Sequence, residues 1–294
     1  MATLLNDHAP QLVTDQLTLS YLDDVVVRDL SLTIPSGKMT ALIGANGSGK
    51  STILKALGRV LKPRAGAVYL DGETIHGQST RAVARRLALL PQSPDAPDGL
   101  TVRELVGYGR FPYQRGFGAL TPEDLRMIDW ALTVTGLHDL AARAVGSLSG
   151  GQRQRAWIGM ALAQGTPILL LDEPTTYLDM AHQLEVLQLL DRLNRDAGHT
   201  IVMVLHDLHH AARYAHYLVA IQDGQVIATG APQEIVTPQL LRNVFGVEAD
   251  ILIDPRSGVP LCVPYALAES PGEHHAEPSG PVAPTARMPQ ARKA

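Results

Sequence analysis

Near the N-terminus, apolar and polar residues alternate as they do in strands with one buried face. Residues 17–21 read LTLSY and residues 30–34 read LSLTI, with a Pro-Ser-Gly turn at 35–37. This period of two predicts a small antiparallel sheet at the front of a domain.

Three later segments are uninterrupted apolar runs, the pattern of strands that are buried on both faces. They span residues 39–43, 168–171 and 201–205. Between the last two, apolar residues recur at helical spacing and predict a helix over 183–193. The order strand, helix, strand is that of a βαβ unit, so we expect an α/β fold with a parallel sheet covered by helices.

The segment from about 91 to 147 has a different character, because helix signals dominate it. Thr121-Pro122-Glu123-Asp124 resembles a helix start, with a capping residue, a proline at the first position and acids in the first turn. We therefore expect a mainly helical subdomain inserted into a domain of residues 12–264. Residues 1–11 are expected to be a short tail. Residues 265–294, rich in Pro and Ala, are expected to be disordered.

The composition narrows the class of protein. The 294 residues carry 25 Lys+Arg and 29 Asp+Glu, and this slightly acidic balance gives no electrostatic sign of nucleic-acid binding. The one cysteine, Cys262, excludes an internal disulfide and fits a reducing compartment. The first ten residues lack the features of a signal peptide, and no apolar run reaches the roughly 18 residues of a membrane-spanning helix. We expect a soluble cytosolic protein.

A glycine-rich loop directly follows the strand at 39–43 and opens a helix expected over 50–61. Its sequence, which matches G-x-x-x-x-G-K-[ST], is Gly44-Ala45-Asn46-Gly47-Ser48-Gly49-Lys50-Ser51-Thr52. Glycines let successive N–H groups turn toward phosphate oxygens, and the helix N-terminus adds positive charge. Lys50 would reach the β- and γ-phosphates, Ser51 would bind Mg²⁺ and Thr52 would support the α-phosphate. A plain turn is the alternative, and the loop alone does not separate a kinase from a GTPase or a motor.

A second glycine-containing segment begins another helix. In Leu148-Ser149-Gly150-Gly151-Gln152, Ser149 is placed as the N-cap, and the two glycines leave their N–H groups unobstructed. An ordinary capped helix start does not require a Gly-Gly pair followed by Gln. The pair therefore indicates a second anion-binding helix terminus.

The apolar run at 168–171 ends in two carboxylates. Adjacent residues on a strand point to opposite sides, so the two acids can take separate roles. Asp172 suits a Mg²⁺ shell and Glu173 suits the polarisation of an attacking water. A solvated strand end is the bland alternative.

Taken together, these motifs resemble the nucleotide-binding subunit of ATP-binding-cassette (ABC) transporters over about residues 12–264. The resemblance implies a P-loop NTPase (RecA-like) core with an antiparallel β subdomain and an inserted α-helical subdomain. It identifies 44–52 as the Walker A loop, 148–152 as the signature and 168–173 as the Walker B strand with a catalytic glutamate.

The resemblance also assigns roles to single residues. Gln92 matches the Q-loop residue that links the γ-phosphate and Mg²⁺ to the membrane partner, and His206 matches the switch histidine. Asp179 lies in the D-loop, and Tyr21 falls where the family places an aromatic against adenine. As alternatives, Tyr21 could be a plain strand residue and Gln92 an ordinary loop residue.

A metal cluster is an alternative for His206 together with His209 and His210. No thiol or paired carboxylate accompanies these histidines, which argues against zinc. Arg153 and Arg155 are interpreted as helix-surface cations rather than catalytic residues.

The family mechanism implies that two copies pair head to tail, each ATP lying between one Walker A loop and the opposite signature. The residues supplied in trans would be Ser149, Gly150, Gly151, Gln152 and Asp179. The resemblance further implies a peripheral protein at the cytoplasmic face of the inner membrane, bound to permease subunits and served indirectly by a substrate-binding protein. Its docking surface is expected over 92–113, with Pro112, Tyr113 and Phe117 as candidate contacts; a core or loop role is the equal alternative for these three residues.

Residues 89–92, 101–106 and 108–110 are similar to the importer branch for ferric siderophores, heme and vitamin B12. Residues 172–179 are especially similar to ferric-siderophore and ferric-citrate ATPases, and residues 205–208 and 255–262 point the same way. These residues would not touch cargo, so the iron assignment rests on analogy. Heme, vitamin B12 or another metal chelate stays open as cargo.

A soluble ABC protein of DNA repair or translation usually has paired cassettes or long coiled-coil inserts, and neither is visible. A non-hydrolysing binding module is disfavoured because Glu173 and His206 are both present.

Overall fold

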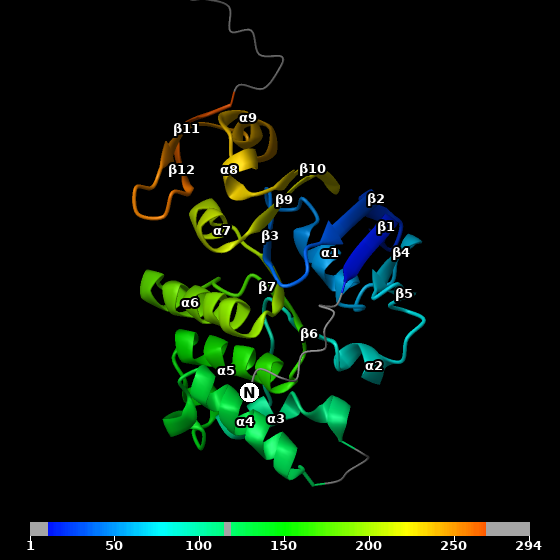
Figure 1. The fold of residues 1–294 in the computed structure, drawn as a ribbon, viewed down its shortest axis with the longest axis vertical. Coiled ribbons are helices and arrows are strands. Elements are labelled where there is room, and N and C mark those ends of the chain that lie inside the picture. Colours follow the sequence, from blue (N-terminus) through cyan, green and yellow to red (C-terminus); the bar gives the residue numbers. More distant parts are fainter. Residues whose placement is uncertain (1–10, 115–118, 269–294) are drawn as a thin grey trace, which may run out of the picture.

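The computed structural model describes residues 11–114 and 119–268, built around a six-stranded sheet (Figure 1). The strand order is β10-β9-β3-β8-β7-β6, and β10 alone runs antiparallel to its neighbour. The strands are β3 (Met39–Ile43), β6 (Leu87–Leu90), β7 (Ile168–Asp172), β8 (Thr200–Val204), β9 (Tyr217–Gln222) and β10 (Gln225–Gly230). Every residue of β3, β7 and β8 is buried, which confirms the parallel sheet expected from the apolar runs.

A second, antiparallel sheet lies beside the first. It has the order β2-β1-β4-β5 and comprises β1 (Leu12–Tyr21), β2 (Asp24–Ile34), β4 (Ala65–Leu70) and β5 (Glu73–Thr74). The alternation read from the sequence is visible in burial, since Leu17 and Leu19 are fully enclosed. These residues pack in one cluster with the apolar face of helix α1 (Lys50–Leu57).

Helix α1 is four residues shorter than expected. Gly58 caps its C-terminus, and Arg59 follows with a left-handed φ of 64°, a backbone conformation that cannot continue a helix.

Helices α3 (Val102–Tyr108), α4 (Pro122–Val134) and α5 (Gly150–Ala163) pack together as the green lower part of Figure 1. Thr121 caps α4 as expected, and its side chain exchanges hydrogen bonds with the third residue of the helix, Asp124. The helical layer continues beyond residue 147, because α5 packs against both α3 and α4. The short 3-10 turns of this region are η1 (Phe111–Tyr113), η2 (His138–Leu140) and η3 (Val145–Ser147).

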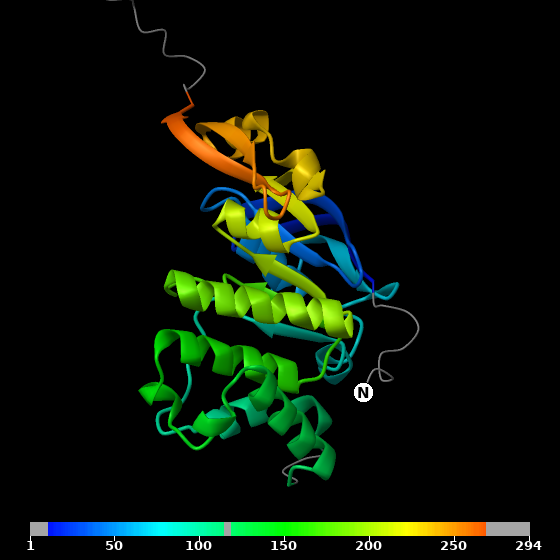
Figure 2. The ribbon, with the colours of Figure 1, turned by 60° about the vertical axis from the view of Figure 1, so that its left-hand side comes forward.

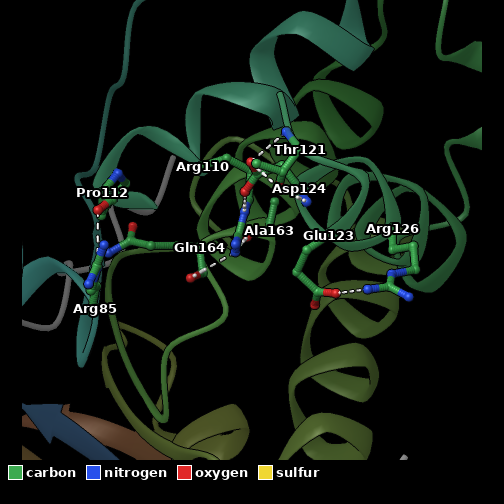
Figure 3. A network of polar contacts seen from close by, with 9 residues as sticks. All are labelled: Arg85, Arg110, Pro112, Thr121, Glu123, Asp124, Arg126, Ala163 and Gln164. Atoms are coloured by element: carbon green, nitrogen blue, oxygen red, sulfur yellow. Dashed lines mark hydrogen bonds and ion pairs between the residues drawn. The ribbon is translucent and has the colours of Figure 1, made fainter. Parts of the chain in front are cut away.

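A network of polar contacts holds the helices of this subdomain together and links them to the core (Figure 3). Arg110, which follows α3, pairs with Asp124 of α4 at 2.8 Å and donates to the Ala163 carbonyl at the end of α5, also at 2.8 Å. Next to it, Gln164 donates to the Leu87 carbonyl at the start of β6. The buried pair therefore joins the three helices, and Gln164 ties the end of α5 to the edge of the central sheet.

The remaining elements cover the sheet or follow it. They are α2 (Thr80–Ala84), α6 (Met180–Ala197), α7 (Leu208–Tyr214), α8 (Pro232–Ile235), α9 (Pro238–Leu240), η4 (Leu241–Phe245) and the hairpin strands β11 (Val247–Ile253) and β12 (Pro260–Leu267). Figure 2 shows α6 lying between the helical subdomain and the sheet, with the orange hairpin at the far end.

Strand β12 reaches three residues beyond the boundary expected at 264, because its last residues pair with β11. Phe117 and the segment 269–294 lie outside the described residues. Within the described part, no helix combines the length and apolar character needed to cross a membrane.

Candidate functional site

The glycine-rich loop connects β3 to α1, and at Gly44 its backbone passes so close to β9 that only glycine fits. Gly44 has a φ of 147°, and a Cβ placed on it would lie 2.1 Å from the Ile221 carbonyl oxygen of β9. Gly49 has a φ of 101° and precedes α1 with no side chain capping the helix. The first-turn N–H groups of α1 are therefore available to an anionic ligand, whose charge the helix dipole favours.

Lys50 places a cation inside this loop. Its Nζ donates to the carbonyl oxygens of Gly44 at 2.9 Å and Ala45 at 2.7 Å, and the side chain is buried. Burial lowers the pKa of Lys50, while the nearby charges of Glu173 and Asp172 act in the opposite direction. The loop thus holds the positive charge of Lys50 near the carboxylates of Glu173 and Asp172.

Asp172, the last residue of β7, is one of these carboxylates. Its Oδ1 accepts a hydrogen bond of 2.7 Å from the Ser51 hydroxyl of α1. Burial raises the pKa of Asp172, and the bond from Ser51 partly offsets this. A hydroxyl and a carboxylate held together beside a phosphate loop form a hard oxygen donor set of the kind that Mg²⁺ prefers.

Glu173 lies just beyond the end of β7 and has a left-handed φ of 51°. The alternation argument placed both acids on the strand, but β7 ends at Asp172, so strand geometry does not set the direction of Glu173. The left-handed backbone instead turns Glu173 into a polar cluster: Oε1 lies 2.6 Å from His206 Nε2, and Oε2 accepts from Gln92 Nε2 at 2.6 Å and from Thr176 Oγ1 at 2.9 Å. Three side chains, from the segments that follow β6, β7 and β8, thus converge on one carboxylate.

The pKa of Glu173 lies below its ordinary value as a result. Burial alone would raise it, but the hydrogen bonds from His206 and Thr176, the charge of His206 and the bond from Gln92 together outweigh that effect. The carboxylate is therefore ionised at neutral pH and can accept a proton or a hydrogen bond from water.

Most of these groups line a cavity of about 710 Å³, although Asp172 is not among its lining residues. It is lined by Val26, Asn46, Gly47, Gly49, Lys50, Ser51, Thr52, Gln92, Glu173, Thr176, Tyr177 and His206. The structure thus brings most of the phosphate-loop candidates together with Gln92, Glu173 and His206, although these lie far apart in the sequence.

Other candidates lie outside that lining. Tyr21, at the end of β1, is 45% exposed and does not border the cavity. Ser149 caps α5 as expected and exchanges hydrogen bonds with Gln152, whose Oε1 accepts from the Ser149 N–H. Asp179 caps α6. Neither the segment 149–152 nor Asp179 lines the cavity of its own chain.

Three lining residues had no role of their own assigned from the sequence, although the resemblance places Tyr177 in the D-loop. Thr176 follows Glu173 by three residues, a spacing at which a side chain in a tight turn can reach back, so its position gave a usable signal. Tyr177 has a left-handed φ of 64° and is 89% exposed. Val26 is an apolar residue of a strand, and nothing in its sequence context marks it as part of a site.

The histidine cluster considered as a metal site does not assemble as one. His206 pairs with Glu173, while the backbone N–H groups of His209 and His210 donate to Asp207 at the start of α7. Across residues 11–114 and 119–268, no group of three or more His, Cys, Asp or Glu side chains is arranged to hold a metal ion.

Comparison with known proteins gives consistent results. A family model described as "ABC transporter" matches residues 27–176 of this chain. The chain is 58% identical to the iron(3+)-hydroxamate import ATP-binding protein FhuC of Bacillus subtilis over 262 residues, which cover 89% of this chain and 97% of that protein. It is 48% identical to the ferric enterobactin transport ATP-binding protein FepC of Escherichia coli over 260 residues, covering 88% and 96%.

Solved structures show the same architecture. An inward-facing ABC transporter described as of metal-chelate type matches with a TM-score of 0.76 and 28% identity, over 88% of this chain and 98% of that one. The dimeric bacterial ABC transporter cassette MJ0796 matches with a TM-score of 0.66 and 30% identity, over 75% and 98%. The fold, the cavity and these similarities together place the chain in the ABC transporter family, as an ATP-binding and ATP-hydrolysing cassette with a P-loop NTPase fold.

Proposed function

We propose that this chain is the ATP-hydrolysing subunit of an importer and that it energises uptake of an iron(III)-siderophore-type chelate through a separate membrane permease. The observation that carries the enzymatic part is the convergence of His206, Gln92 and Thr176 on Glu173 beside the Lys50 loop. The cargo is supported by the relatives, whose names specify iron(3+)-hydroxamate and ferric enterobactin at 58% and 48% identity.

In this proposal the chain's own groups perform the hydrolysis. The loop amides and Lys50 bind the β- and γ-phosphates, and Thr52 supports the α-phosphate. Glu173 accepts a hydrogen bond from a water, whose oxygen attacks the γ-phosphorus as the bond to the β–γ bridging oxygen breaks, giving ADP and phosphate. Lys50 and His206 stabilise the charge that develops on the transferred group.

Ser51, Asp172 and Gln92 are the residues that would hold Mg²⁺ with the nucleotide. The hydrogen-bonded Ser51–Asp172 pair supports this placement, because both side chains present oxygen atoms next to the phosphate loop. When bound, the ion neutralises charge on the β- and γ-phosphates.

A second copy of the chain would complete each site. The cavity of this chain is not lined by Ser149, Gly150, Gly151, Gln152 or Asp179. In a head-to-tail dimer these residues would contact the nucleotide in the partner's cavity. The dimeric form of the MJ0796 cassette supports such a pairing. Tyr21 would stack on the adenine from the exposed end of β1.

The permease would dock on the helical subdomain near 92–113, which places the chain at the cytoplasmic face of the inner membrane as a peripheral subunit. A substrate-binding protein would deliver the chelate on the other side. Support comes from the match to one chain of a transporter described as of metal-chelate type.

Uptake by a deletion strain tests the cargo. A strain lacking the gene is supplied with the wild-type chain or with Glu173→Gln, and accumulation of radiolabelled ferric hydroxamate, ferric citrate, heme and cobalamin is measured. The proposal predicts that only the wild-type chain restores uptake of a ferric siderophore. Restoration of heme or cobalamin uptake alone would reassign the cargo, and full restoration by Glu173→Gln would contradict the hydrolytic role.

A further inference from the structure

The first turns of α5 and α6 are in close contact where Gly151 meets His182. A Cβ placed on Gly151 would lie 2.2 Å from Cδ2 and 2.6 Å from Cγ of the His182 ring. Real Cβ atoms do not approach this closely, so the imidazole occupies the space that any larger residue at 151 would need. The ring of His182 therefore rests directly on the backbone of the segment 148–152, here called the signature segment.

The same ring is held from its other side. Asp179 Oδ1 lies 2.7 Å from His182 Nδ1 and also accepts from the His182 backbone N–H at 2.9 Å. The backbone bond already caps α6. The ring contact is thus additional to the cap, and the histidine side chain is not required for the helix to begin at Met180.

Asp179 ends the loop that starts at Glu173, and hydrogen bonds restrain this 173–179 loop. Thr176 donates to Glu173, and Gln183 Nε2 donates to the carbonyl oxygens of Thr175 at 3.4 Å and Leu178 at 3.1 Å. The path from Glu173 to the signature segment therefore consists of a short restrained loop, one acid–imidazole pair and one ring packed on a glycine.

We propose that His182 is a positioning residue that couples the 173–179 loop of a chain to the signature segment of the same chain. This inference rests on the proposed function, in which the signature segment contacts the ATP held by the partner copy. A displacement of the loop at one ATP is then passed through Asp179 and His182 to the residues that contact the other ATP. Each cassette links the two sites through its own side chains.

A neighbouring contact provides a matched control. One turn further along the same helix pair, Arg155 of α5 faces Glu185 of α6 at 3.5 Å. Glu185→Gln weakens the contact between the same two helices but leaves the 173–179 loop and Gly151 untouched. A general loosening of α5 against α6 would therefore appear in both variants, and a loss of coupling only at His182.

The experiment compares His182→Ala, His182→Phe and Glu185→Gln in the full chain. His182→Phe keeps a ring against Gly151 but cannot pair with Asp179, so it separates packing from hydrogen bonding. ATP affinity is measured under conditions that keep the chain monomeric, stability by thermal unfolding, and turnover by steady-state hydrolysis. We expect His182→Ala to lower kcat by roughly three- to tenfold, as expected for loss of one partly exposed pair and its packing. The monomer's ATP affinity and the KM should stay unchanged, and His182→Phe should fall between His182→Ala and wild type.

Two failures can be told apart. Full kcat in His182→Ala, or an equal fall in Glu185→Gln, overturns the coupling role while leaving the proposed function intact. The variants Glu173→Gln and Ser149→Arg test the proposed function itself. Unchanged turnover in both would contradict an ATP site shared by two copies, on which the inference rests.

Discussion

The buried pair between Arg110 and Asp124 gives a sharp test of what holds the helical subdomain together (Figure 3). The two residues are 4% and 2% exposed, and Asp124 also accepts from the backbone N–H and hydroxyl of Thr121. Removing one partner of a buried pair costs about 3–5 kcal/mol, because the other charge is left uncompensated. Asp124→Asn keeps an acceptor for Thr121, so we expect the free energy of unfolding to fall by about 3 kcal/mol, the lower end of this range.

For a chain of this size, such a loss corresponds to a fall in Tm of roughly 6–12 °C. Urea unfolding of wild type, Asp124→Asn, Arg110→Met and the double variant measures the coupling between the two residues. The double variant should be less destabilised than the sum of the two single changes, by about 2 kcal/mol, because it no longer buries an unpaired charge. A loss below about 1 kcal/mol in Asp124→Asn, or strict additivity in the double variant, would refute the reasoning.

The same pair should respond to acid. Burial acts to raise the pKa of Asp124, but the hydrogen bonds from Thr121 and Arg110 outweigh it and hold the pKa below its ordinary value. A carboxyl whose pKa is lowered in the folded state stabilises the fold above its unfolded pKa, near 3.9, and loses that contribution as the pH falls through the folded value. The difference in unfolding free energy between wild type and Asp124→Asn should therefore be constant from about pH 6 to 8 and shrink below about pH 4.

Four further outcomes are expected. Glu173→Gln should retain ATP binding but lose at least about a hundredfold in hydrolysis, measured by phosphate release, and normal turnover would contradict its role. Gly44→Ala should lose ATP binding in a nucleotide-binding assay, because its Cβ would meet the Ile221 carbonyl at 2.1 Å; unchanged binding would show that the loop can shift. Tyr21→Ala should weaken ATP affinity by roughly threefold and Tyr21→Trp should not, whereas equal effects would argue against stacking. The thiol of Cys262, whose pKa burial raises to about 11, should react with a thiol reagent only after unfolding, and rapid labelling of the folded chain would contradict its packing.

The sequence was sufficient for the sheets and the phosphate loop because their signals are local. Full burial on both faces requires an unbroken apolar run, as in β7, and the loop needs glycines where φ is positive, as at Gly44 and Gly49. The caps at Thr121 and Ser149 were also predictable, since a capping side chain acts within three residues of its own position.

The parts that the sequence did not reveal depend on three-dimensional placement. Glu173 lies just beyond β7 with a left-handed backbone that no glycine signals, so strand alternation does not apply to it. The early end of α1 rests on a similar conformation at Arg59. The contact between His182 and Gly151 joins two helix starts about thirty residues apart, and no period in either helix encodes it.

The central claim, that two copies share each ATP, is tested most directly by the mass of the Glu173→Gln chain in solution with and without ATP. Light scattering should show one copy without nucleotide and two with ATP. Adding Ser149→Arg should return the protein to one copy while ATP still binds. A Glu173→Gln chain that stays monomeric at saturating ATP, or a Ser149→Arg variant that still pairs, would contradict the account.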